Sequence, residues 1–192
     1  MFGFTGIFGI MAGILSFSAY LFYIVAILKG KTKPSRATWF IWAIIGIILA
    51  ISYRASGAED TIWVAVSEAI APTIIALLAI KYGVGGTEKI DIIAFVGALF
   101  SLVLWWVFGS PVVALVANLA IDFFAAIPTI KKSWTTPEEE DRFAWSLTQT
   151  GNLFNLFAID KIIFGVIIYP VYTFLIDGVI TGLLFRKINI KK

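Results

Sequence analysis

The sequence predicts an all-α integral membrane protein with seven transmembrane helices. Its 192 residues are 60% hydrophobic and 14% charged, whereas a soluble domain is about half apolar and about a quarter charged. Apolar runs of about 18 to 25 residues alternate with short charged segments, and each run is long enough to cross a hydrocarbon core about 30 Å thick. Backbone groups in hydrocarbon must pair within their own segment, so we expect the spans to be helices.

Seven apolar segments are expected to cross the membrane, joined by short connections rich in turn residues. The sixth is the most polar, because LTQTGNLFN lies at its centre. The first begins MFGFTGIFGIMAGIL and lacks the basic region and cleavage site of a signal peptide. The predicted spans are residues 4–28, 37–54, 61–82, 90–108, 112–131, 143–159 and 162–185.

The distribution of basic residues predicts the orientation. Thirteen of the 15 lysines and arginines fall on one side of the seven-span scheme, and only Arg54 and Lys161 fall on the other. Basic residues gather on the cytoplasmic side of membrane proteins. We therefore expect a multi-pass protein of the cell (inner or plasma) membrane, with its N-terminus outside and its C-terminus in the cytoplasm.

Two junctions of similar composition indicate an internal repeat. KTKPSRATWFIW begins at residue 31, and TTPEEEDRFAW begins at residue 135. At an offset of 103 residues, seven of the nineteen positions from 24 to 42 are identical, including Trp42 and Trp145. Tryptophan at a membrane interface explains either residue singly, but not this spacing. Two parallel repeats of this kind form transporters with a site at midplane between the halves.

The repeat divides the chain into three parts. Residues 1–86 form the first three-helix repeat, 87–110 contain the linker helix, and 111–192 form the second repeat. After three helices the chain lies on the opposite side of the membrane, and the linker helix returns it to the side from which it started. The two repeats are therefore expected to be parallel.

This plan, the outside N-terminus and the chain length resemble the SWEET and PQ-loop superfamily of small-solute transporters. Pro128 and Thr129 occupy the place of that family's Pro-Gln pair, and Val25 and Ala26 are the matching pair in the first repeat. TKPSRATWFIW is also similar to uncharacterised bacterial membrane proteins. The resemblance implies a fold of two three-helix bundles and transport by alternating access.

Polar residues at membrane depth are the candidate site, because a polar or ionisable side chain there is costly and usually functional. Several recur on single helix faces, at spacings of three, four and seven residues. Amides and hydroxyls can also serve only to link helices, at about 0.6 kcal/mol each. The candidate substrate-binding residues are Trp42, Glu68, Asn118, Asp122, Trp145, Thr148, Asn152, Asn155, Thr173 and Asp177.

Two further roles follow from residue type. A carboxyl group that is buried without a cationic partner tends to bind a proton, so Asp122, and after it Asp177 or Glu68, are candidates for proton coupling. Proline interrupts the hydrogen bonding of a helix. The candidate hinges for gating are Pro72, Pro128 and Pro170.

The absence of histidine and cysteine narrows the function classes. It removes disulfides, the usual nucleophile–base pairs and the usual zinc ligands. We expect no enzyme activity, no cofactor, no metal and no nucleic-acid partner, because the basic residues flank spans. A rhodopsin is excluded, since the last span has no central lysine.

Two functions remain. The first is a transporter of a small polar solute, acting as a facilitator or coupled to protons. The second is a receptor or scaffold of the same fold that binds a small ligand or a partner's tail. The expected partners are the lipid bilayer and a small solute, and a homo-oligomer is compatible with the sequence.

Overall fold

The described part of the chain is entirely helical. The computed structural model describes residues 3–30, 34, 36–83, 96, 100, 103–104, 106–135, 137 and 142–186. Every regular element within these residues is a helix, which confirms the all-α class. The long helices are α1 (Phe4–Leu28), α2 (Arg36–Ala55), α3 (Ile62–Tyr82), α5 (Pro111–Thr135), α6 (Arg142–Phe157) and α7 (Phe164–Leu184).

The helix boundaries follow local sequence signals. Gly30, Gly57 and Gly109 all have positive φ, at 69°, 105° and 59°, a backbone region that glycine enters without steric cost. Each lies in the connection next to a helix. Pro111 begins α5, where a missing amide N–H is tolerated. The predicted fourth span, 90–108, lies mostly outside the described residues.

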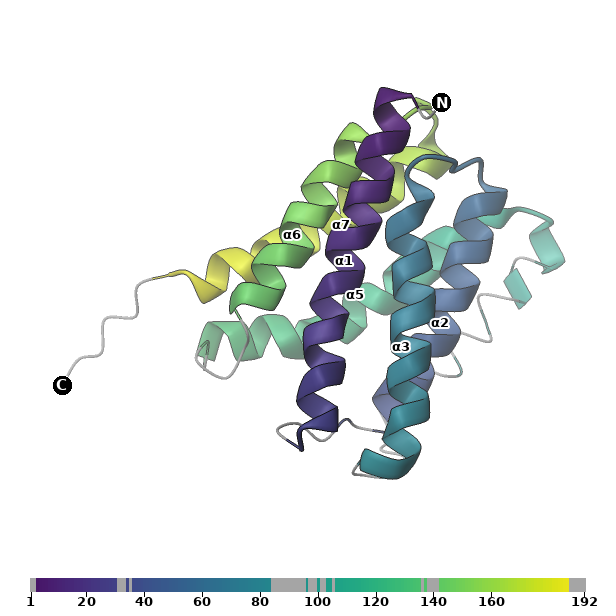
Figure 1. Ribbon diagram of the computed structural model, residues 1–192. Coiled ribbons are helices and arrows are strands. Elements are labelled where there is room, and N and C mark those ends of the chain that lie inside the picture. The colour runs from purple at the N-terminus through teal and green to yellow at the C-terminus, as the bar shows by residue number, and fades with distance from the viewer. Residues whose placement is uncertain are drawn as a thin grey trace.

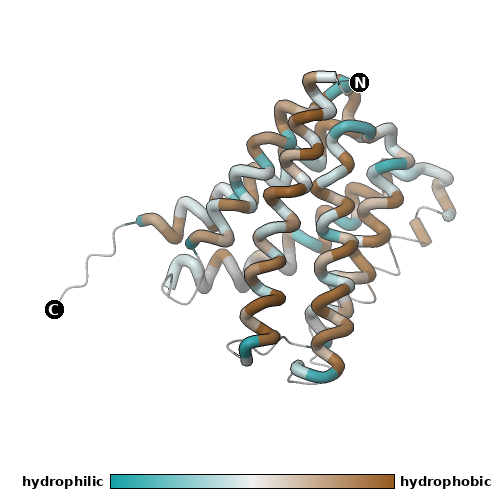
Figure 2. Tube along the Cα trace, in the orientation of Figure 1, coloured by the Kyte–Doolittle hydropathy of each residue, from teal (hydrophilic) through white to brown (hydrophobic). Residues whose placement is uncertain are grey.

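Three of these helices are long and apolar enough to cross a membrane, namely Phe4–Leu28, Ile62–Tyr82 and Phe164–Leu184. Apolar side chains such as Ile14, Leu77 and Leu175 are about 60% exposed on their outer faces. Figure 2 shows apolar residues along most of α1 and α3, with hydrophilic residues near the helix ends. A surface of this kind indicates association with a membrane.

The order of packing is the same in the two sets of three helices. Helix α3 packs against both α1 and α2, and α7 packs against both α5 and α6. Within the described residues, the backbone of α1 does not come within 8 Å of that of α2, nor that of α5 within 8 Å of that of α6, although side chains of α1 and α2 touch. Between the sets, the main contacts are α1 with α6 and α2 with α5 (Figure 1).

Glycines allow α1 to approach α3 closely. A methyl group at Gly9 would overlap the backbone carbonyl of Asp60, and one at Gly13 would lie 2.7 Å from the Cβ atom of Trp63. Such small-residue contacts let helices pack without a hydrophobic driving force. The pair Gly9 and Gly13 therefore fixes the position of α1 on α3.

The main buried cluster lies towards one end of the bundle. We call this the Lys161 end: α1 begins there, α2 turns into α3, and α6 turns into α7 (Figure 1). Tyr53, Ala65, Leu115 and Tyr169 belong to this cluster, and all four are fully buried. The opposite end, where α1 ends and α2 begins, is called the Trp39 end. A smaller buried cluster, around Ile27 and Trp39, lies near this second end.

Candidate functional site

A cavity of about 500 Å³ lies among α1, α2, α3, α5, α6 and α7. Its lining comes from the second half of α1, the first two thirds of α2, the middle parts of α3, α5 and α7, and the first turns of α6. The cavity therefore extends from the middle of the bundle towards the Trp39 end. The volume falls within the range of about 300–1,000 Å³ that is typical of small-molecule sites.

Three carboxyl groups from three helices line this cavity: Glu68 on α3, Asp122 on α5 and Asp177 on α7. The hydroxyl of Tyr169 donates to Oε2 of Glu68 at 2.9 Å, and that of Tyr172 donates to Oδ2 of Asp122 at 2.7 Å. No lysine or arginine is among the described lining residues. The polar part of the cavity is therefore acidic.

The third carboxyl group, that of Asp177, accepts a hydrogen bond from a buried amide. Asn152 on α6 donates from Nδ2 to Oδ2 of Asp177 at 2.7 Å and to the carbonyl oxygen of Thr173 at 3.3 Å. Asn152 is fully buried and does not line the cavity. It therefore orients Asp177, and α6 is joined to α7 at this point.

Aromatic rings form the wall nearer the Trp39 end. The Trp39 ring centroid is 5.0 Å from that of Tyr23, 5.1 Å from that of Trp42 and 6.4 Å from that of Tyr20. The planes of Trp39 and Trp42 are nearly perpendicular, at 88°. All four residues line the cavity, and Trp145 lines it from α6. One wall of the cavity is therefore aromatic.

The structure brings most of the predicted site residues to this one cavity. Asn118, Asn152 and Asn155 are the exceptions, because all three are fully buried outside its lining. The side-chain oxygen and nitrogen of Asn155 have no hydrogen-bond partner among the described residues. The predicted residues that do line the cavity are Trp42, Glu68, Asp122, Trp145, Thr148, Thr173 and Asp177.

Two tyrosines of α7 belong to the site although neither is among the site residues that the sequence predicts. Tyr169 and Tyr172 both line the cavity and bind its carboxyl groups. They are three residues apart and share a helix face with Thr173 and Asp177. A tyrosine hydroxyl is a donor that a buried carboxyl group needs, and this complementarity was the available signal.

Prolines interrupt both central helices, α3 at Pro72 and α7 at Pro170, and both are buried. A proline has no amide hydrogen, so the carbonyl four residues earlier loses its helical donor. In α7 that carbonyl belongs to Val166, and the hydroxyl of Tyr53 on α2 donates to it at 2.7 Å. The third predicted hinge, Pro128, lies within α5, and its side chain lies outside the described residues.

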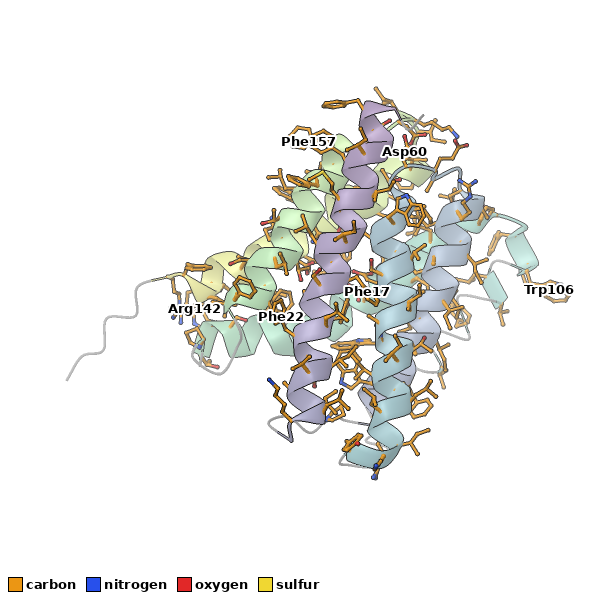
Figure 3. The ribbon with its side chains drawn as sticks, in the orientation of Figure 1. Phe17, Phe22, Asp60, Trp106, Arg142 and Phe157 are labelled. Atoms are coloured by element: carbon orange, nitrogen blue, oxygen red, sulfur yellow. The ribbon has the colours of Figure 1, made fainter. Side chains whose placement is uncertain are left out.

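Several contacts close the Lys161 end. Lys161 donates from Nζ to Oε1 of Glu59 at 2.6 Å and to the carbonyl oxygen of Gly57 at 3.3 Å. Thr5 donates to Oδ2 of Asp60 at 2.6 Å, and Figure 3 shows Asp60 at this end. The hydrogen bond and positive charge of Lys161 lower the pKa of the Glu59 carboxyl group. The cavity does not extend into this end, since none of these residues lines it.

Neither a known family model, nor a curated protein, nor a solved structure matches this chain. The chemistry of the cavity is thus the basis for assigning a function. Its main features are three carboxyl groups, a set of aromatic rings and a closed end that joins α2 and α3 to α6 and α7.

Proposed function

We propose that the protein transports a small polar solute across a membrane by alternating access between two halves, α1–α3 and α5–α7. The observation that carries this proposal is the position of the cavity. It lies between the two halves, it is lined by three carboxyl groups, and it stops at an end where residues of both halves bind each other. A cavity with one closed end is what one state of an alternating-access cycle requires.

The order of helix packing supports two parallel repeats within a seven-span chain. If α1, α2 and α3 correspond to α5, α6 and α7, the central helix is α3 in one set and α7 in the other. The same correspondence converts the contact of α1 with α6 into that of α5 with α2, and both contacts exist. An approximate two-fold axis along the membrane normal would produce this exchange.

The distribution of basic residues supports an assignment of this state. The Lys161 end carries Arg54 and Lys161, which the positive-inside rule places outside the cell. The closed end would then face outside, and the cavity would face the cytoplasm. In this proposal, transport requires that the contacts of Tyr53 and Lys161 break while the Trp39 end closes.

The carboxyl groups support coupling to protons. Asp122 lines the cavity, and its Oδ2 atom accepts a hydrogen bond from Tyr172 on α7, not from α6. A carboxyl group that meets water from each side in turn can take up a proton on one side and release it on the other. Asp122 is the first candidate for this role, and Asp177 and Glu68 are the alternatives.

Uptake by reconstituted protein tests the proposal. Liposomes that contain the protein are incubated with a mixture of small polar metabolites, washed, and analysed by mass spectrometry beside empty liposomes. A transporter accumulates at least one solute to many molecules per protein. A receptor or scaffold retains no more than one molecule per protein, and that result would replace transport with the second function.

A further inference from the structure

We infer that the solute is an organic cation: a quaternary ammonium compound or a protonated amine with apolar substituents. This inference rests on the proposed function, because it names the substrate class of the same cavity. It is carried by two independent features, the charge of the cavity and the geometry of its aromatic wall. Each feature selects against a different group of solutes.

The carboxyl groups of the cavity favour a positively charged ligand. Glu68, Asp122 and Asp177 each use one carboxyl oxygen in a hydrogen bond, and their other oxygens have no partner among the described residues. The described lining contains no lysine or arginine that would neutralise them. A carboxylate at membrane depth is costly unless it is paired or binds a proton. A cationic solute can pair with the carboxylates directly, whereas an anionic solute is repelled and a neutral one gains nothing from their charge.

The three carboxyl groups do not form a metal site. Among the described residues, no group of three acidic, histidine or cysteine side chains is close enough to hold one metal ion. Glu68, Asp122 and Asp177 come instead from three different helices around a space of about 500 Å³. A bulky organic cation fits this arrangement better than a single dehydrated metal ion does.

The aromatic wall fits the apolar groups around a cationic nitrogen. A cation is attracted to the face of an aromatic ring within about 6 Å of its centre, and several rings around one site form the cages that bind quaternary ammonium groups. Trp39 and Trp42 lie at 88° to each other, and Tyr20 and Tyr23 lie beside Trp39. Two perpendicular tryptophans can border two sides of one such group.

Matched pairs of ligands test the inference on the purified full-length protein. Choline is compared with 3,3-dimethyl-1-butanol, which has the same shape without the charge, and cyclohexylammonium is compared with cyclohexanol. Binding is measured by isothermal titration calorimetry. We expect at least one cation to bind at least about tenfold more tightly than its neutral partner. The inference is overturned if neither cation binds, or if the neutral compounds bind equally well.

Variants then locate the binding. Glu68→Gln removes a charge but keeps an acceptor for Tyr169, and Trp39→Leu removes a ring. Each should weaken binding of the preferred cation by about tenfold without weakening that of its neutral partner. Asp160→Asn also removes a negative charge, but from an exposed position at the Lys161 end, and should leave binding unchanged. Unchanged cation binding in both Glu68→Gln and Trp39→Leu would overturn the inference.

Cation binding and solute uptake, measured together, distinguish a failure of this inference from a failure of the proposed function. If cations bind selectively but no solute accumulates in liposomes, the site assignment holds and transport fails. If a neutral solute accumulates and cations do not bind, transport holds and the cationic substrate class is wrong. Thermal unfolding gives a second readout when a variant yields too little material for calorimetry. Choline should raise the melting temperature of the wild type, which retains Glu68, more than that of Glu68→Gln.

Discussion

The hydroxyl group of Tyr53 on α2 lies 2.7 Å from the carbonyl oxygen of Val166 on α7. It lies at the same distance from Oγ1 of Thr61. A phenol has one proton and a carbonyl can only accept, so Tyr53 donates to Val166 and Thr61 donates to Tyr53. The donor that Pro170 removes from α7 is thus replaced by a donor from the other half of the bundle. This bond joins the two halves at the closed end.

Replacement of Tyr53 by phenylalanine should weaken the closed end. The variant keeps the ring, which lies 4.7 Å from that of Tyr169, but leaves the Val166 carbonyl and the Thr61 hydroxyl without this buried partner. An unsatisfied buried group costs about 1–3 kcal/mol, and the free energy of unfolding should fall by that amount. Tyr82→Phe at the partly exposed end of α3 is the matched control and should change little.

A double-mutant cycle with Pro170→Ala tests the cause of that loss. Alanine restores an amide hydrogen four residues after Val166, so α7 can satisfy this carbonyl itself. Tyr53→Phe should then cost less than it does beside proline. If the two effects add to within about 0.5 kcal/mol, Tyr53 and Pro170 are independent and this explanation is wrong.

The close approach of α1 to α3 predicts opposite effects at two glycines. A methyl group at Gly9 would overlap the carbonyl of Asp60, and overpacking of this kind costs about 1–3 kcal/mol. Gly182 on α7 has no heavy atom within 4 Å of an added methyl group, so Gly182→Ala should stabilise by up to about 1 kcal/mol through helix propensity. Thermal unfolding in detergent measures both. If alanine at Gly9 and alanine at Gly182 changed the melting temperature equally, the close contact at Gly9 would be contradicted.

The ion pair between Lys161 and Glu59 should make the closed end sensitive to acid. Lys161 lowers the pKa of Glu59 below its ordinary value of 4.5, so the pair stabilises the fold above that pH and loses its contribution as the pH falls through the lowered pKa. The side chains are 40% and 55% exposed, so the effect should be small and screened by salt.

Comparison with Glu59→Gln isolates this pair. Wild type should unfold at a higher temperature than the variant at pH 7, and the difference should vanish at acidic pH. Asp160→Asn, an exposed acid at the same end, serves as the control for a change in net charge. A difference that stays constant from neutral to acidic pH would show that the pair has no such role.

Asp122 should couple uptake to a proton gradient. Its single bond from Tyr172 leaves it in the cavity without a basic partner among the described lining residues. In reconstituted liposomes, Asp122→Asn should abolish the stimulation of uptake by a pH difference while exchange of solute for solute continues. Thr148→Val also changes a polar lining residue, but removes no titrating group, and should keep the stimulation. Accumulation that still follows the pH difference in Asp122→Asn would move this role to Asp177 or Glu68, or to neither.

Much of the fold was predictable because hydropathy determines where membrane-spanning helices begin and end. Residues 4–28 were predicted as one helix and form α1, and the prediction of 143–159 overlaps α6 despite its polar centre. Turn residues such as Gly57 marked the connections. The order of packing was not predictable in the same way, since the contact of α1 with α6 joins residues more than a hundred positions apart.

The site was predictable only in part because a helix face is longer than a cavity. Trp145, Thr148, Asn152 and Asn155 share one face, and ten residues of helix extend about 15 Å. The first two line the cavity, whereas the last two are buried beyond its wall. The bond of Tyr53 to Val166 was also invisible in the sequence, because it depends on how α2 meets α7.

Thiol labelling from the two sides of a membrane tests alternating access most directly. The chain has no cysteine, so single-cysteine variants give no background. Thr148→Cys places a thiol in the cavity, and Ala65→Cys places one in the buried cluster at the Lys161 end. A membrane-impermeant maleimide is added to one side at a time, with and without solute.

Alternating access predicts that Thr148→Cys reacts from the side of the Trp39 end and that Ala65→Cys reacts, more slowly, from the opposite side. Solute or a pH difference should then change the two rates in opposite directions, because opening one end closes the other. If Ala65→Cys never reacts while Thr148→Cys does, or if both react from the same side, the two halves do not alternate and the protein is not a transporter of this kind.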